Sequence, residues 1–134
     1  MGKGKVRIEE EKLDMYSRDE DSDKLWEKMP EVVVKPENVE QVSEIVKLAN
    51  RELLPITPRG GGTGLAAGAV PLSGGLVLSL EKMNKILEVD TENLFMVVEP
   101  GVTTGESTKT SQGPGTFMMT GPQLLRTVTL LAVA

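Results

Sequence analysis

The residues best suited to chemistry in this sequence form a glycine-rich loop at residues 60–69, where glycine and alanine dominate. Glycine lets a backbone adopt positive φ and approach a ligand closely, and consecutive free N–H groups in such a turn form a concave site for an anion. Arg59 adds a positive charge and Thr63 a hydroxyl that can face a phosphate. The loop predicts a site for a phosphate-containing cofactor. A flexible linker or a tight turn is the alternative that these residues leave open.

Two familiar phosphate-binding loops do not fit the cluster. A P-loop requires Lys and then Ser or Thr after its last glycine, and no lysine lies between Lys47 and Lys82. The pattern G-x-G-x-x-G/A is present at residues 62–67, but its glycines must open a helix of several turns. The following segment, residues 68–75, contains Pro71 and two more glycines before strand character returns. The classical nicotinamide-binding fold is therefore not expected.

The amino-acid composition excludes several kinds of catalytic and binding site. The chain has 134 residues, enough for one domain, and contains neither cysteine nor histidine. It therefore lacks thiol nucleophiles, the commonest general base and the commonest ligand of transition metals, and we predict no catalytic residue and no metal site. A net charge of -5 argues against a nucleic-acid partner. No run approaches the roughly 20 apolar residues of a membrane span, and no apolar leader is evident, so the cytoplasm is the expected compartment.

The elements before the loop must position it. Val32–Val34 is a β-branched run that predicts a short buried strand. Pro36 and Glu37 suit the first turn of a helix, and a spacing of three and four predicts one apolar face made of Val39, Val42, Val46, Ala49 and Leu53. A second strand is predicted at residues 54–58. Strand, helix and strand form a βαβ unit, which makes parallel pairs with a right-handed crossover.

Further strands are predicted after the loop, at residues 76–80, 86–89 and 95–99. The turn-forming residues 90–93 connect the last two strands and predict a hairpin. Residues 103–106 can begin a helix with a hydroxyl cap. The predicted fold class is α+β, a βαβ unit followed by further strands.

The N-terminal arm, residues 1–29, is mostly charged and has few bulky apolar residues. It predicts a short helix and an irregular segment that pack on a larger body. A solvated tail is the alternative.

Several motifs in order resemble one known family. They are Lys-Pro-Glu-Asn-Val-Glu-Gln-Val at residues 35–42, Pro-Arg-Gly-Gly-Gly-Thr-Gly at 58–64, and the runs at 78–86 and 98–103. Together they resemble the FAD-binding domain of the vanillyl-alcohol oxidase, or p-cresol methylhydroxylase (PCMH), type. Within it they resemble the branch of the glycolate oxidase flavoprotein subunit and the D-lactate dehydrogenases. The resemblance covers residues 30–106 and implies the N-terminal lobe of that domain.

The resemblance implies FAD as the cofactor and assigns residues to it. In the family the glycine loop wraps the FAD pyrophosphate through backbone amides, which assigns contact to Arg59, Gly60, Gly61, Gly62, Thr63 and Gly64. Pro58 would shape the entry, and Leu65 and Gly68 would lie further along the cofactor. Pro100 and Gly101 would lie near the flavin. An ordinary turn for Pro100-Gly101 and a core position for Leu65 remain the alternatives.

Beyond Glu106 the family continues into a second glycine-rich FAD motif and a substrate domain, and we find neither motif in residues 107–134. We therefore expect three segments: an arm at 1–29, half of an FAD-binding domain at 30–106, and a tail at 107–134 outside the family pattern. A frameshift or premature end of a longer reading frame is our hypothesis for that tail.

Intact relatives oxidise 2-hydroxy acids by hydride transfer to flavin. The resemblance thus implies FAD binding by a fragment of an FAD-dependent oxidoreductase that is incomplete for catalysis on its own. One alternative is a non-catalytic module that associates with itself or with another oxidoreductase subunit. Another is a nucleotide or sugar-phosphate binder that uses only the loop.

Overall fold

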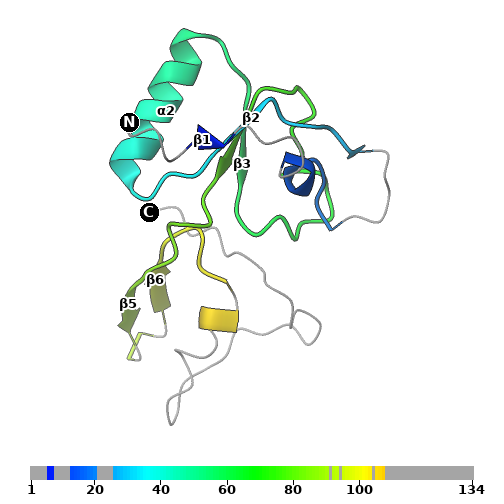
Figure 1. Ribbon diagram of the computed structural model, residues 1–134. Coiled ribbons are helices and arrows are strands. Elements are labelled where there is room, and N and C mark those ends of the chain that lie inside the picture. Colours follow the sequence, from blue (N-terminus) through cyan, green and yellow to red (C-terminus); the bar gives the residue numbers. More distant parts are fainter. Residues whose placement is uncertain are drawn as a thin grey trace.

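The computed structural model describes residues 6–7, 13–20, 26–90, 92–93, 95–103 and 105–107, and the predicted tail lies almost entirely outside them. A four-stranded sheet with one long helix forms the larger body, and a two-stranded hairpin projects beside it (Figure 1). The α+β prediction is confirmed. The elements in chain order are β1 (Val6–Arg7), η1 (Asp14–Tyr16), β2 (Val32–Val34), α2 (Val39–Arg51), β3 (Ile56–Arg59), β4 (Leu76–Ser79), β5 (Ile86–Asp90) and β6 (Phe95–Val98).

The larger sheet has the strand order β1-β2-β4-β3. Strands β2 and β3 both run parallel to β4, with Val32 and Ile56 each opposite Leu76. The strands of the predicted βαβ unit are therefore parallel, but β4 lies between them. All four residues of β4 are buried, which suits the centre of a sheet. Pro58 in β3 cannot donate a ladder hydrogen bond, which suits the edge.

Helix α2 begins at Val39, later than Pro36, because Asn38 caps it. The Asn38 side chain accepts a hydrogen bond from the Gln41 N–H at 2.9 Å. Ile45 and Ala49 are buried, and Val42 packs beside them. Three residues of the predicted apolar face are instead exposed, namely Val39, Val46 and Leu53. Leu53 lies beyond the end of the helix with φ 53°. No helix of the described residues is long and apolar enough to cross a membrane.

Both faces of the sheet are covered, because successive side chains of a strand point to opposite sides. On the helix side, Val34, Leu76 and Leu78 pack with Ile45. On the other side, Val33 and Val77 pack with Leu13 of the arm, and Tyr16 lies against this cluster. The residues of the arm around Leu13 are thus packed on the sheet, as the first of the two alternatives predicted.

The predicted hairpin is present. Strands β5 and β6 are antiparallel, with Ile86 opposite Val98 and an irregularity between Ile86 and Glu88. The Asp90 carboxylate accepts hydrogen bonds from the N–H groups of Glu92 and Asn93 at 2.9 and 2.8 Å and so closes the turn.

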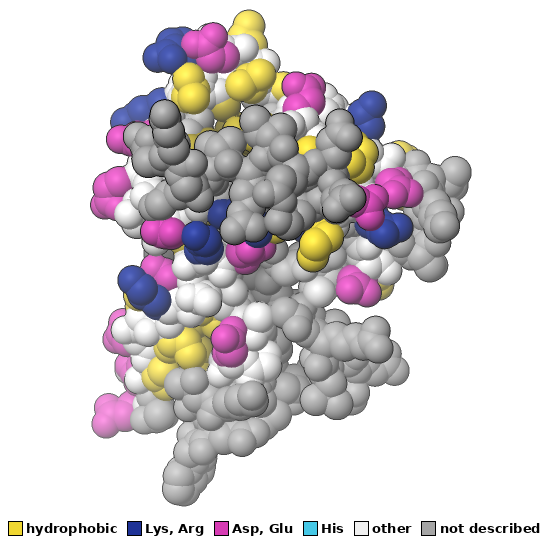
Figure 2. Space-filling view, in the orientation of Figure 1, with side chains coloured by type: hydrophobic (Ala, Val, Ile, Leu, Met, Phe, Trp, Pro, Cys, Tyr) yellow, Lys and Arg dark blue, Asp and Glu magenta, His cyan; other side chains and the backbone are white. Residues whose placement is uncertain are grey.

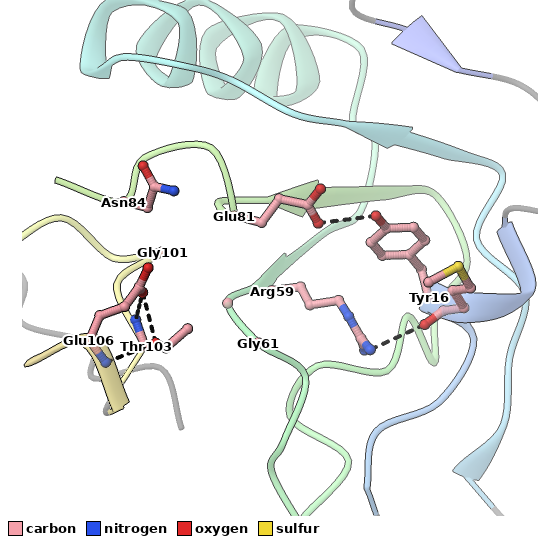
Figure 3. A pocket seen from close by; sticks show the side chains of 10 residues that line it. Tyr16, Arg59, Gly61, Glu81, Asn84, Gly101, Thr103 and Glu106 are labelled. Carbon is pink, nitrogen blue, oxygen red and sulfur yellow. Dashed lines mark hydrogen bonds between the residues drawn. The ribbon is translucent and has the colours of Figure 1, made fainter. Parts of the chain in front are cut away.

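The predicted hydroxyl cap follows the hairpin. The Glu106 N–H donates to Thr103 Oγ1 at 3.2 Å, and the Thr103 N–H donates to Glu106 Oε2 at 3.0 Å. This reciprocal pair is a capping box. Figure 3 shows the two side chains next to each other, with the hydrogen bonds between the residues drawn as dashed lines.

Candidate cofactor-binding site

A cavity of about 290 Å³ lies between the arm, the end of β3 and the turn after β6 (Figure 3). Four residues assigned to the cofactor from the sequence line it: Arg59, Gly60, Gly61 and Gly101. The structure thus brings the start of the glycine-rich loop and the turn after β6 to one place, although about forty residues separate them in the chain.

The other assigned residues do not line this cavity. In the loop, Gly62, Thr63, Gly64, Leu65 and Gly68 follow the lining residue Gly61, while Pro58 lies within β3 and Pro100 precedes the lining residue Gly101. The Leu65 side chain is 71% exposed, so it does not take the core position considered as an alternative.

Six lining residues were not predicted as site residues: Met15, Tyr16, Glu81, Asn84, Thr103 and Glu106. The capping pattern of Thr103 and Glu106 was a signal for two of them. For Tyr16 the sequence holds no comparable signal, because its partner Glu81 lies 65 residues away.

The glycine-rich loop leaves consecutive backbone donors open. Within the described part of the chain, no hydrogen bond is donated by the N–H groups of Gly62, Thr63, Gly64 or Leu65. Gly62 has φ +70°, and a Cβ added there would lie 2.2 Å from Arg59 Nη2. The glycine therefore permits both the turn and the close approach of the guanidinium. Open amides beside a cation suit an anionic ligand.

Arg59 is held by backbone oxygens. Its Nη1 donates to the carbonyl of Arg18 at 2.8 Å and to that of Ala69 at 3.4 Å, and its Nη2 donates to the carbonyl of Met15 at 3.2 Å. It forms no ion pair with a carboxylate of the described residues.

The charge of Arg59 is therefore available to a ligand. Burial lowers the pKa of Arg59, and the nearby Tyr16, Asp19 and Glu81 oppose that shift. A guanidinium stays protonated at neutral pH in either case, so the side chain can attract a phosphate.

Glu81 is an acidic group in the cavity whose charge is already compensated. Its carboxylate forms an ion pair with Lys35 at 2.5 Å and accepts hydrogen bonds from Ser79 at 3.0 Å and Tyr16 at 3.1 Å. Burial acts to raise the pKa of Glu81, but the hydrogen bonds from Lys35, Ser79 and Tyr16 hold it below its ordinary value. The Tyr16 ring contacts Lys35 and Arg59, with 5.2 and 5.5 Å from the ring centroid to Lys35 Nζ and Arg59 Cζ.

These groups fit the pyrophosphate of FAD. Four open amides and one arginine match the negative oxygens of a pyrophosphate, and Lys35 neutralises Glu81, a carboxylate that lines the cavity. On the face drawn in Figure 2, the described basic and acidic side chains are interspersed and form no basic patch that would suit a nucleic acid.

An α+β domain with an open-amide glycine loop at the end of a parallel strand defines a binder of a phosphate-containing cofactor. Comparison with known proteins identifies the cofactor. The family described as "FAD binding domain" matches residues 30–134, and the chain belongs to this family. FAD is therefore its cofactor. The match extends beyond residue 106, so the boundary expected there stays a prediction.

Two curated relatives agree with the resemblance. The chain is 37% identical over 110 residues to the glycolate oxidase subunit GlcD of Bacillus subtilis, a match covering 82% of this chain and 23% of the relative. It is 56% identical over 72 residues to a D-lactate dehydrogenase of Archaeoglobus fulgidus, covering 54% and 16%. The chain thus spans less than a quarter of the length of these relatives.

A solved structure supports the fold. The chain superposes on p-cresol methylhydroxylase with bound substrate at a TM-score of 0.65 and 29% identity, covering 84% of this chain and 22% of that one. The predicted N-terminal lobe of a PCMH-type FAD-binding domain is confirmed.

Proposed function

We propose that the glycine-rich loop binds the pyrophosphate of FAD. The contacts are assigned to the backbone of Gly60, Gly61, Gly62, Thr63 and Gly64 together with the Arg59 guanidinium. Pro58 shapes the approach, Leu65 and Gly68 lie further along the cofactor, and Pro100 and Gly101 lie on the flavin side. The observation that carries the proposal is the run of four amides at residues 62–65 beside Arg59. Among the described residues, these amides donate no hydrogen bond and Arg59 forms no ion pair with a carboxylate.

We further propose that the chain is the cofactor-binding part of an oxidoreductase that acts on 2-hydroxy acids. The two curated relatives support this substrate class, because one is a glycolate oxidase subunit and the other is a D-lactate dehydrogenase. The chain has no histidine. Of the two carboxylates in the cavity, Glu81 is paired with Lys35 and Glu106 caps a helix. Neither carboxylate is thus free to take a proton from the substrate. Because the match covers less than a quarter of these relatives, we propose that the chain is incomplete for catalysis on its own.

Binding measurements with three ligands test this function. Equilibrium dialysis of the chain against FAD, ADP and riboflavin separates the pyrophosphate from the flavin ring. Binding of FAD and ADP without binding of riboflavin is the expected result, because riboflavin has no phosphate. Binding of ADP without FAD would favour the simpler nucleotide binder. Retention of riboflavin alone would refute the loop as the main contact.

Association with a second copy or with another oxidoreductase subunit is a second candidate function. This candidate rests on two apolar side chains of α2 that face solvent, because Val39 is 67% exposed and Val46 is 43% exposed. Sedimentation velocity across a range of concentrations tests it, with Val46→Lys expected to lower the fraction of any dimer. A monomer at every concentration would argue against self-association. We also propose the cytoplasmic location expected from the sequence, and cell fractionation tests it.

A further inference from the structure

The arm contacts the glycine-rich loop at its far end, where the sequence predicted no contact. The Asp19 carboxylate accepts a hydrogen bond from the Ala67 N–H at 2.9 Å. The N–H of the next residue, Glu20, donates to the carbonyl of Gly64 at 3.3 Å. The arm therefore contacts the loop within the run of open amides, at the Gly64 carbonyl, and just after that run, at Ala67.

Ala67 is the point in the loop that most needs such support. Its φ is +56°, which is a left-handed conformation. This conformation is unfavourable for any residue that has a Cβ, and it persists only where neighbouring contacts enforce it. Its carbonyl accepts a hydrogen bond from the Val70 N–H at 3.1 Å, and its N–H donates to Asp19. One of the two hydrogen bonds at this residue thus comes from the arm.

We propose that Asp19 is a positioning residue of the cofactor site, which holds Ala67 in its left-handed conformation and so keeps the preceding amides in their binding arrangement. This inference rests on the proposed role of the loop in binding the FAD pyrophosphate. The carboxylate also lies near Gly64, where an added Cβ would be 3.9 Å from Asp19 Oδ2. Asp19 is therefore placed beside both Gly64 and Ala67 rather than at the cavity wall.

A competing role for the same carboxylate makes the opposite prediction. A negative charge beside open amides repels an incoming phosphate and can take its place. If Asp19 competed with the cofactor, removing its charge would tighten FAD binding. If Asp19 positions the loop, removing its acceptor weakens FAD binding, and an uncharged acceptor preserves it.

Four variants separate these roles: Asp19→Ala, Asp19→Asn, Ala67→Gly and the double variant Asp19→Ala with Ala67→Gly. Asp19→Ala is expected to raise the dissociation constant for FAD roughly tenfold, the effect of one hydrogen bond to a charged group. Asp19→Asn retains an oxygen acceptor and should stay within about threefold of the unmodified chain. Glycine adopts positive φ without strain, so Ala67→Gly should restore part of the affinity lost in Asp19→Ala.

Glu20→Ala is the matched control. It removes a neighbouring carboxylate but keeps the backbone N–H that donates to Gly64, so FAD affinity should not change. Equal or tighter FAD binding by Asp19→Ala, or no rescue by Ala67→Gly, would overturn the positioning role.

Amide hydrogen exchange without FAD keeps this inference separate from the proposed function. Asp19→Ala should speed exchange at the Ala67 amide, because its acceptor is lost, whereas Asp19→Asn should not. If the unmodified chain fails to bind FAD but shows this difference, the positioning of the loop stands and the proposed function fails. Unchanged exchange at Ala67 in Asp19→Ala would overturn the positioning role whatever the outcome with FAD.

Discussion

Two segments that reach one cavity, which we call its two walls, use glycine for opposite purposes. The glycine-rich loop lines the cavity with Gly60 and Gly61 and continues beyond it, and the turn after β6 lines it with Gly101. In the glycine-rich loop, Gly62 is followed by amides that donate no hydrogen bond within the described residues. In the turn after β6, the Gly101 N–H donates to the Met83 carbonyl at 2.7 Å, and the next N–H donates to the Glu99 carbonyl at 3.1 Å. Glycine keeps donors open for a ligand on the first wall. On the second it allows two backbone segments to pack together.

The two walls also differ in what holds them. A Cβ at Gly101 would lie 2.3 Å from the Leu80 carbonyl oxygen, so the backbone itself fixes that turn. The loop is held by side chains, because Arg59 reaches the arm and Asp19 of the arm reaches Ala67. A substitution in the packed wall should therefore mainly lower the stability of the fold, and a substitution in the binding wall should mainly lower the affinity for FAD.

The largest effect is expected at the packed wall. Gly101→Ala forces a methyl group against the backbone of the β4–β5 connection, and such overpacking costs about 3 kcal/mol or more. Urea denaturation measures the loss. Gly105→Ala is the control, because an added Cβ there meets no atom within 4 Å. Equal unfolding midpoints for the two variants would show that the absence of a side chain at Gly101 is not needed for packing.

The next effect is expected at the binding wall. Gly62→Ala places a side chain at φ +70°, which costs about 1–2 kcal/mol of stability. It also displaces the Arg59 guanidinium, which is 2.2 Å from the added Cβ. FAD affinity should fall more than tenfold, in excess of the stability loss, as followed by quenching of FAD fluorescence. Gly74→Ala provides the comparison, because Gly74 also has φ +70° but neither lines the cavity nor is assigned to the cofactor. An affinity unchanged by Gly62→Ala would contradict the difference between the walls.

Arg59→Lys tests whether the cation must also have the shape of a guanidinium. A lysine keeps the charge but cannot reproduce the fork that spans the carbonyls of Met15 and Arg18. We expect roughly tenfold weaker FAD binding, in line with a lost charge-assisted contact, and faster amide exchange in residues 13–20. Full retention of affinity would show that charge alone is sufficient.

The smallest effect concerns the Glu81–Lys35 pair, which links the arm to the sheet through Tyr16. Because the folded state lowers the pKa of Glu81, its contribution to stability is present above the unfolded pKa, near 4.3. That contribution is lost as pH falls through the lower folded value. Glu81→Gln should therefore flatten the decline of the melting temperature between about pH 5 and pH 3. An unchanged decline of the melting temperature in this pH range would show that the Glu81–Lys35 pair does not contribute to stability.

The sequence predicted those parts of the molecule that local patterns determine. Val32–Val34 and Leu76–Ser79 are largely apolar runs, and each can be predicted as a strand without knowing which segments it packs against. The glycine-rich loop was recognisable because its composition is itself unusual. The hairpin was recognisable because the turn residues around Asp90 and Asn93 are adjacent in the chain.

What the sequence did not predict depends on contacts between distant residues. Arg59 reaches Met15 across 44 positions and Asp19 reaches Ala67 across 48, and no spacing rule connects such pairs. The helix face was wrong at Val39 and Val46 because a periodic pattern identifies apolar positions but not which ones the sheet covers. The position of β4 between β2 and β3 likewise depends on burial over the whole sheet.

The most direct test of the central claim is an NMR titration of the ¹⁵N-labelled chain with FAD, followed at the backbone amides of residues 62–65. We predict that these four amides shift together as FAD is added, that ADP reproduces the shifts and that riboflavin does not. Shifts confined to residues outside the loop, with the four amides unchanged at saturating FAD, would show that the cofactor is held elsewhere.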